Sequence, residues 1–155
     1  MKLKIPNFKN IDIKNIVFDY NGTLAKDGYL DIKTQEKLFE VCELYNVFVV
    51  TADTFGTVKN QLKDFNLKVF VLSSENHLNE KAQFIKKIGS NETVSFGNGN
   101  NDEEMLKNAA ISISVIGEEG CSKKALLACD IVCKDILTAM DLLLNKKRLI
   151  ATLRQ

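Results

Sequence analysis

The sequence predicts an α/β fold in which helices cover both faces of a mostly parallel β-sheet. Two observations favour this fold class. Short apolar runs, the pattern of buried parallel strands, alternate along the chain with longer segments of helical periodicity. Polar turns rich in Asn, Asp and Gly follow several of these strands. Alternating strands and helices build parallel sheets with right-handed crossovers, so we expect a doubly wound sheet.

Six strands are expected to form this sheet, and a short hairpin precedes it. Apolar and polar residues alternate at 3–5 and 11–13 around Pro6-Asn7, which predicts a small antiparallel hairpin. The first core strand, 15–19, contains an apolar run that stops at Asp19. The other strands are expected at 47–51, 68–72, 93–96, 111–116 and 131–133.

Helices are expected in the segments between these strands. Asp31 is a candidate N-cap for a helix over 32–44, and Gly89 ends a helix over 77–88. The remaining helices are expected at 55–64, 102–109, 122–128 and 136–144, the first of them burying Val58 and Leu62. The basic tail, 146–155, is either a solvated helix end or a segment that docks on the core or on another subunit through Leu149, Ile150 and Leu153.

Length and charge exclude several classes of protein. A chain of 155 residues with 45% hydrophobic residues suffices for one core, and we expect a single domain over residues 1–155. The charges of the 21 basic and 20 acidic residues nearly cancel, so the composition does not indicate electrostatic binding to nucleic acid or membrane. No apolar run is long enough to span a bilayer, and the N-terminus lacks the apolar core of a signal peptide, so we expect a cytoplasmic protein.

The cysteines do not indicate a structural metal site. Cys42, Cys121, Cys129 and Cys133 form no Cys-x-x-Cys pair, and the single histidine, His77, is expected in a loop. Cys42 and Cys129 occupy apolar helical positions, so we expect both to be core thiols in a reducing compartment.

Polar groups follow three of the expected strands, at one edge of the sheet. Asp19-Tyr20-Asn21-Gly22-Thr23 follows the first strand, Thr51-Ala52-Asp53 ends the second, and Gly97-Asn98-Gly99-Asn100-Asn101-Asp102 ends the fourth. Lys81, near the start of a helix, could reach the same edge. A carboxylate nucleophile, a hydroxyl, a lysine and an oxygen-rich pocket for Mg²⁺ are the parts that phosphoryl transfer requires.

These segments resemble the four motifs of the haloacid dehalogenase superfamily of phosphohydrolases, and most of all the soluble relatives of the phosphorylation domain of P-type ATPases. The first segment, Phe18 to Leu24, matches hydrophobic-Asp-x-x-Gly-Thr-Leu, and Thr51-Ala52-Asp53 is similar to the second motif. Lys81 matches the third-motif lysine, and the stretch from Gly97 to Asp102 is similar to the fourth. The resemblance covers about residues 15 to 133 and implies a Rossmann-like fold and an aspartyl-phosphate phosphatase.

The resemblance also implies a role for each matching residue. Asp19 is expected to be the nucleophile, with Thr51 and Lys81 holding phosphoryl oxygens. Further contacts to the phosphoryl group are expected from Gly22, Thr23, Ala52 and Asn101. Mg²⁺ is expected on Asp19, on the backbone carbonyl of Asn21, and on Asn98 and Asp102. Without the motif context, Thr51 would be a strand-end hydroxyl, and Asp53 is better placed as a helix cap than as a catalytic group.

Two asparagines depart from the family pattern. Asn21 stands where the phosphatases carry a general acid and base, and an amide cannot exchange a proton near neutral pH. Asn98 stands where the family carries a metal-binding acid. The sequence therefore leaves two functions open: a Mg²⁺-dependent phosphohydrolase that turns over slowly, or a phosphate-binding regulatory module.

The spacing of the motifs bears on the substrate. Neither gap between motifs has room for the cap domain that selects substrates in the family, so we expect a capless protein with an open site. Such a site suits a large substrate, such as a macromolecule, or closure by a neighbouring subunit of a homo-oligomer. The expected partner is a phosphorylated substrate, either a small molecule or a macromolecule.

Overall fold

The computed structural model describes residues 1–53, 56–73 and 75–155. Its main sheet consists of β3 (Asn15–Phe18), β4 (Asn46–Thr51), β5 (Leu67–Val71), β6 (Thr93–Gly97), β7 (Ile111–Val115) and β8 (Ile131–Cys133). The strands run in the order β5-β4-β3-β6-β7-β8, and every neighbouring pair is parallel. The predicted doubly wound α/β fold is therefore confirmed.

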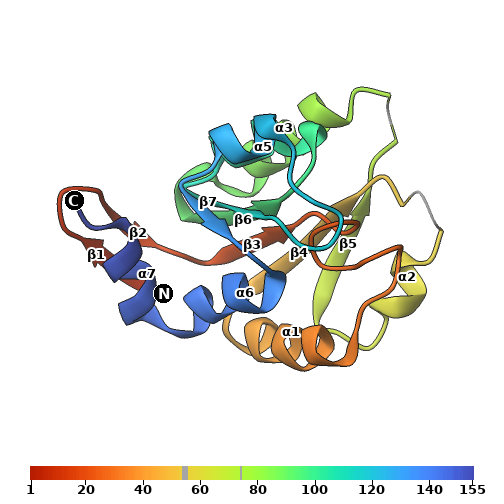
Figure 1. Cartoon of the computed structure of the whole chain (residues 1–155), viewed down its shortest axis with the longest axis horizontal. Helices are drawn as coiled ribbons and strands as arrows, with labels where there is room; N and C mark the ends of the chain where they lie inside the picture. Colours follow the sequence, from red (N-terminus) through yellow and green to blue (C-terminus); the bar gives the residue numbers. More distant parts are fainter. Residues whose placement is uncertain (54–55, 74) are drawn as a thin grey trace.

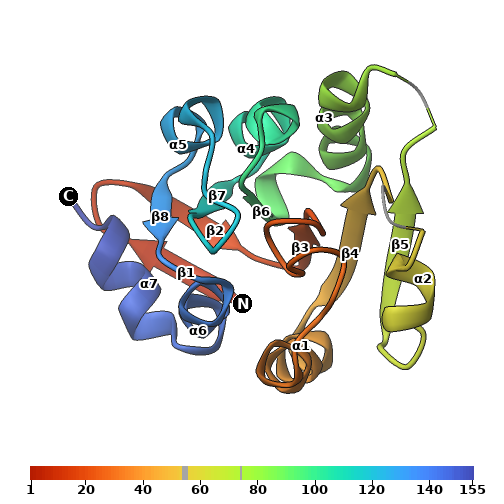
Figure 2. The ribbon, with the colours of Figure 1, turned by 45° about the vertical axis from the view of Figure 1, so that its right-hand side comes forward.

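Helices cover both faces of this sheet (Figure 1). They are α1 (Ile32–Leu44), α2 (Val58–Gln61), α3 (His77–Ile88), α4 (Glu103–Asn108), α5 (Lys123–Ala128) and α6 (Ile136–Leu144), with 3₁₀ turns at Ser90–Glu92 and Asn100–Asp102. Figure 2 shows α3, α4 and α5 on one face, and α1 and α6 on the other. Because helices shield both faces, β3, β6 and β7 are buried along their whole length.

The central strand is β3, which lies between β4 and β6. The ring of Phe18 packs 4.6 Å from the ring of Phe96 on β6, measured between centroids. The chain leaves β3 to form α1 on one face and later returns to β6 on the other side of β3. Strand order reverses at this point, and open α/β sheets bind ligands at the carboxyl ends of the strands beside such a reversal.

Local signals in the sequence fix the start of α1. The carboxylate of Asp31 accepts hydrogen bonds from the backbone N–H of Thr34 at 3.0 Å and from its hydroxyl at 2.7 Å. These bonds satisfy a donor that the first helical turn leaves unpaired. The predicted N-cap and the predicted range of this helix are both confirmed.

The N-terminal hairpin and the C-terminal tail form one unit at the far end of the molecule. β1 (Lys2–Ile5) and β2 (Lys9–Asp12) pair in antiparallel register, as expected from their alternation. The tail forms α7 (Lys146–Leu153), whose Leu149 and Leu153 are buried in the same apolar cluster as Leu3. Figure 1 shows the hairpin, α7 and both termini together. Of the alternatives for the tail, docking on the core of its own chain is the one found.

Two expectations from the sequence are wrong in detail. The helix expected over 55–64 is only the single turn of α2, and Phe55 lies outside the described residues, although Val58 and Leu62 are buried as expected. Cys129 is not a core thiol, because α5 ends at Ala128 and Cys129 is its half-buried C-cap. Cys133 on β8 is buried instead. All four cysteines are free.

The described part of the chain contains no helix of the length and apolarity that crossing a membrane requires.

Candidate active site

Asp19 lies at the carboxyl end of the central strand, as the first motif predicts. Its backbone N–H donates to the carbonyl of Phe96 at 2.9 Å, which continues the pairing of β3 with β6 by one residue. Its carboxylate is nearly buried, with 7% of the residue exposed. The sheet thus holds a carboxylate at a fixed position, with a small exposed part through which a ligand can reach it.

Lys81 is completely buried between two carboxylates. Its Nζ lies 2.5 Å from Oδ1 of Asp19 and 2.6 Å from Oδ1 of Asp102, and both Lys81 and Asp102 are 0% exposed. Lys81 comes from α3, Asp102 from the turn after β6, and Asp19 from the end of β3. The structure therefore brings together three predicted residues that are far apart in the sequence.

Burial and mutual charge set the protonation of this cluster. Burial, followed by the nearby charge of Asp102, raises the pKa of Asp19 to about 7, although Lys81 opposes the shift. Burial also disfavours the charge on Lys81, but the two carboxylates outweigh it and raise the lysine pKa above its ordinary value. Lys81 consequently stays a cation at neutral pH and favours the ionised form of Asp19 beside it.

Asp102 is held by the glycine-rich turn that precedes it. Its Oδ2 accepts hydrogen bonds from the backbone N–H groups of Asn98, at 3.0 Å, and Gly99, at 2.8 Å. A Cβ at Gly97 would lie 2.6 Å from the Asp102 side chain, so only glycine fits there. Both carboxylate oxygens of Asp102 thus have protein donors. These contacts make Asp102 an anchor of Lys81, and its expected role as a metal ligand stays a prediction.

Asn98 and Thr23 join the first and fourth motifs. The Thr23 hydroxyl donates to Oδ1 of Asn98 at 3.2 Å, and Nδ2 of Asn98 donates to the carbonyl of Gly120 at 3.0 Å. Gly22 has φ +80°, and a Cβ there would lie 2.4 Å from the Asn98 amide. The glycine of the first motif is required both for its left-handed backbone and for the close approach of Asn98.

The second motif lies beside this cluster. Thr51 ends β4 and is 1% exposed, and its hydroxyl accepts a hydrogen bond from the backbone N–H of Asp53 at 3.0 Å. Asp53 in turn accepts from the N–H of Val58 at 3.2 Å, which supports its reading as a structural cap. Among the described residues, no side-chain hydrogen bond joins Ala52 or Asn101 to the Asp19 cluster, so their expected contacts to a phosphoryl group stay predictions.

Asn21 has a side-chain oxygen without a partner. Within the described residues, its Oδ1 is the single buried side-chain oxygen or nitrogen that lacks a hydrogen bond. Leaving a buried acceptor unpaired costs about 1–3 kcal/mol, so such groups are retained mainly where a ligand or water supplies the missing donor. This amide oxygen is therefore free to accept a hydrogen bond.

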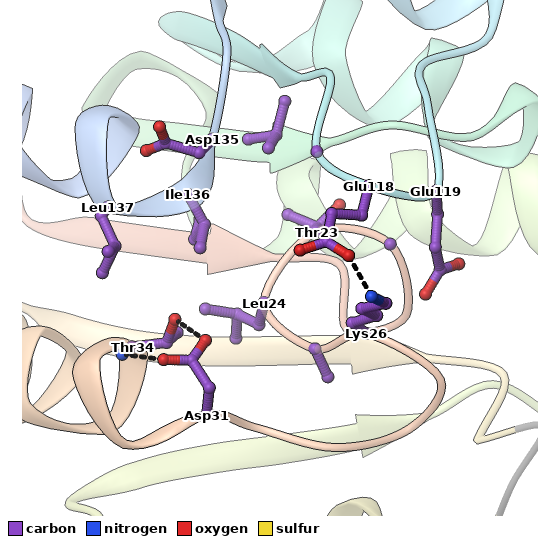
Figure 3. A pocket seen from close by; sticks show the side chains of 14 residues that line it. Thr23, Leu24, Lys26, Asp31, Thr34, Glu118, Glu119, Asp135, Ile136 and Leu137 are labelled. Atoms are coloured by element: carbon purple, nitrogen blue, oxygen red, sulfur yellow. Dashed lines mark hydrogen bonds and ion pairs between the residues drawn. The ribbon is translucent and has the colours of Figure 1, made fainter.

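A separate cavity of about 310 Å³ lies next to the loop that follows Asp19. Loop residues 22–26 line one side of it, and the turn after β7 and the starts of α1 and α6 line the other (Figure 3). None of Asp19, Lys81 and Asp102 lines this cavity. It is distinct from the cluster of Asp19, Lys81 and Asp102, although Gly22 and Thr23 of the first motif line it.

The donors around Asp19 suit a hard divalent cation. In the described part of the chain, no three His, Cys, Asp or Glu side chains lie close enough together to hold a metal ion. A structural zinc site needs four such ligands. Mg²⁺ binds one or two carboxylates and completes its shell with other oxygens and water. The carboxylate of Asp19, the backbone carbonyl of Asn21 and the amide oxygen of Asn98 are donors of that kind, and the unpaired Asn21 Oδ1 is a further oxygen nearby.

Sequence analysis missed the contacts that hold residues 26–30. The side chains of Thr57 and Gln61 in and before α2 bind the backbone of this loop. The Asp27-Gly28 pair was the available signal, because Asp-Gly is typical of tight hairpin turns. Thr57 and Gln61 could not be identified from the sequence. A single glutamine on a short helix looks the same in the sequence whether it binds a loop or is solvated.

A family model described as haloacid dehalogenase-like hydrolase matches residues 76–135, which contain Lys81 and the glycine-rich turn. An uncharacterized protein of Methanocaldococcus jannaschii is 55% identical over 71 residues, which are 45% of this chain and 76% of that protein.

Solved structures of phosphatases have a similar fold. The cobalt-bound deoxy-D-mannose-octulosonate 8-phosphate phosphatase of Haemophilus influenzae superposes with a TM-score of 0.70 at 15% identity, over 86% of this chain and 88% of that one. The corresponding phosphatase of Moraxella catarrhalis, in complex with a magnesium ion, a phosphate ion and the sugar acid, gives a TM-score of 0.66 at 18% identity. That match covers 90% of this chain and 92% of the other.

Proposed function

The chain belongs to the haloacid dehalogenase-like hydrolases, and we propose that within this family it is a phosphohydrolase whose nucleophile is Asp19. The observation that carries this proposal is the position of Lys81. A lysine buried at 2.5 and 2.6 Å between two carboxylates, at the carboxyl end of a central strand, has no evident structural need. Perturbed, paired charges at such an edge are typical of catalytic sites.

The proposed reaction has two chemical steps. In the first, an oxygen of Asp19 attacks the phosphorus atom, the bond from phosphorus to the leaving-group oxygen breaks, and an aspartyl phosphate forms. In the second, water attacks the same phosphorus atom, the bond to Asp19 breaks, and inorganic phosphate leaves. Lys81 holds Asp19 in place and supplies positive charge next to the oxygens on which negative charge accumulates.

A divalent cation, proposed to be Mg²⁺, would be held by Asp19, the backbone carbonyl of Asn21 and Asn98. When bound, it supplies charge neutralisation at the phosphoryl oxygens. Asp102 is proposed to act indirectly, because its contacts fix the positions of Lys81 and of the glycine-rich turn. Thr51, Gly22, Thr23, Ala52 and Asn101 are proposed to surround the phosphoryl group.

Asn21 determines how fast the two steps run. It cannot protonate the leaving group or deprotonate water, but its free amide can accept a hydrogen bond from water and orient it. We therefore propose that the aspartyl phosphate forms best with good leaving groups and is hydrolysed slowly. The same persistence is characteristic of the P-type ATPase phosphorylation domain that the sequence resembles.

The substrate is proposed to be a phosphorylated small molecule, which is what the named phosphatases of the same fold act on. In this chain, the segment between Asp19 and β4 contains only the loop, α1 and the turn to β4. The absence of an inserted cap among these described residues supports an open site, which would also admit a macromolecule.

The experiment is a phosphate-release assay on a panel of aryl, alkyl and anhydride phosphates, with and without Mg²⁺. Asp19→Asn is expected to reduce turnover to background with an unchanged circular dichroism spectrum, since the amide cannot form the aspartyl phosphate. Asp27→Asn is the matched control, because Asp27 is exposed at a left-handed position that asparagine tolerates. Wild-type activity in Asp19→Asn would refute the assignment of the nucleophile.

A second function is favoured by the replacement of two family acids by Asn21 and Asn98. The same fold would then bind a phosphorylated ligand and act as a regulatory module with little turnover. Wild-type protein that binds phosphate with Mg²⁺ but releases none from any substrate would favour this second function.

A further inference from the structure

The loop after the nucleophile is a compact double turn. The N–H of Gly22 donates to the carbonyl of Ala25, and the N–H of Ala25 donates to the carbonyl of Tyr20, both at 2.8 Å. Residues Lys26 and Tyr29 then exchange two backbone hydrogen bonds, at 3.0 and 2.8 Å. Between them, Asp27 and Gly28 have φ of 49° and 79°, the geometry of a type I′ hairpin turn.

The carbonyl oxygen of Gly28 accepts hydrogen bonds from several side chains. Nε2 of Gln61 donates to it at 3.0 Å, the Thr57 hydroxyl at 3.1 Å, and the Tyr20 hydroxyl makes a longer contact of 3.4 Å. Burial and the charge of Asp53 raise the pKa of Tyr20 to about 12, so this hydroxyl keeps its proton. The other end of the Gln61 amide, Oε1, accepts from the N–H of Leu30 at 3.0 Å. Gln61 thus binds the turn at Gly28 and the chain just after the turn at Leu30.

Gln61 connects this loop to the second motif. It lies on α2, whose Val58 N–H donates to the Asp53 carboxylate, and Asp53 is joined through its own N–H to the Thr51 hydroxyl. A chain of hydrogen bonds therefore runs from the end of β4, through α2, to the loop that carries Asn21.

The loop also has contacts in the core and at the surface. Residues 22–26 border the cavity in Figure 3, and Leu24 and Ala25 are at the same time buried in the core cluster. The remaining side-chain contacts of the hairpin tip are the ion pair of Lys26 with Glu118 and the bond from the N–H of Asp27 to Glu119 at 2.9 Å. These acids are exposed, and exposed ion pairs contribute little to rigidity.

We infer that Gln61 is a positioning residue for the site: through Gly28 and Leu30 it sets the distance from the Asn21 carbonyl and the Gly22 N–H to Asp19. The inference rests on the proposed function, because it matters for phosphoryl transfer only if Asp19 is the nucleophile. A displacement of about 1 Å at such a loop can reduce a reaction rate about 10²-fold, so two hydrogen bonds at its far end are sufficient to control the chemistry.

The test compares Gln61→Met with Gln35→Met. Methionine has a similar length but no amide, so each variant keeps volume and removes hydrogen bonds. Gln35 is the matched control, because its Nε2 donates to the carbonyl of Leu30 at 2.8 Å but joins the loop to α1 rather than to the second motif. For both variants and wild type, amide hydrogen exchange in residues 20–30 and the Mg²⁺ dependence of Asp19 phosphorylation are measured.

In Gln61→Met we expect faster amide exchange at Gly22 and Ala25, and about a tenfold rise in the Mg²⁺ concentration for half-maximal phosphorylation. In Gln35→Met we expect both quantities to stay within about twofold of wild type. Unchanged exchange and Mg²⁺ dependence in Gln61→Met, or equal shifts in both variants, would overturn the inference. A wild type that is never phosphorylated would instead refute the proposed function, while amide exchange would still decide whether Gln61 holds the loop.

Discussion

Lys81 illustrates how one residue links stability to chemistry. Its ammonium group is removed from water completely, a loss that only the two facing carboxylates offset. Each carboxylate is itself buried and depends on the lysine in return. The cluster therefore depends on the lysine cation, which stands beside Asp19 as a fixed positive charge.

Lys81→Met should consequently damage both folding and activity. Removing the cation leaves two buried carboxylates facing each other, and breaking a buried pair typically costs about 3–5 kcal/mol. The lost electrostatic donor should lower the rate by about 10²-fold or more. Urea denaturation and single-turnover kinetics measure the two effects. Lys86→Met, an exposed lysine on the same helix, is expected to change neither, and equal behaviour of the two variants would argue against a central role for Lys81.

At the scale of elements, local signals predicted some segments and missed others. The N-cap at Asp31 and the glycine at Gly89 mark helix ends that the structure reproduces, because caps act over one turn and are visible in the sequence. The short length of α2 was not predictable, because the apolar spacing of Val58 and Leu62 continues past Gln61, where the helix ends. Cys129 was misplaced for a similar reason, since its apolar spacing continues past the point where α5 stops.

The C-terminal helix α7 is an element whose docking could not be decided from sequence. Its amphipathic pattern fits either solvent, the core or a partner, and only the packing of Leu149 and Leu153 against the hairpin settles which. The hairpin β1–β2 needs this cover, because a two-stranded sheet alone is marginally stable in water. The two ends of the chain therefore stabilise each other.

Leu149→Ala tests that dependence. Leu149 is 0% exposed, and removing a buried leucine side chain usually costs about 2–5 kcal/mol through lost burial and the resulting cavity. The free energy of unfolding in urea is the measurement. Leu127→Ala is the matched control, since Leu127 is 72% exposed and its truncation should change stability by less than about 0.5 kcal/mol. Equal, small effects would contradict the docking of α7.

At the scale of the whole molecule, the strand order gathers the site. β3 is central, with β4 on one side and β6 on the other, so the ends of these three strands and the start of α3 converge on Asp19. The motifs and their order predicted this convergence, because parallel strands place their carboxyl ends at one edge. Which polar residue pairs with which was not predictable. Asp102 has both oxygens bound by Lys81 and the backbone, and its expected role as a metal ligand stays a prediction.

The contacts that hold the loop around Gly28 could not be predicted from the sequence either. The residues that hold it, Thr57 and Gln61, are near it only because the fold brings α2 against the loop that follows β3. No pattern within either segment indicates that contact. The motifs can thus be identified from the sequence, whereas the contacts that position them depend on the assembled fold.

Acid-quench trapping of the phosphorylated protein tests the central claim most directly. Wild type, Asp19→Asn and Asn21→Asp are mixed with a labelled aryl or anhydride phosphate and Mg²⁺, quenched in acid and analysed for covalent label, beside steady-state rates on an alkyl phosphate. We predict that label accumulates on wild type, is absent from Asp19→Asn, and falls in Asn21→Asp. The new acid and base should raise alkyl phosphate turnover by about 10²- to 10⁴-fold. A wild type without trapped label, together with an Asn21→Asp rate equal to that of wild type, would contradict the account.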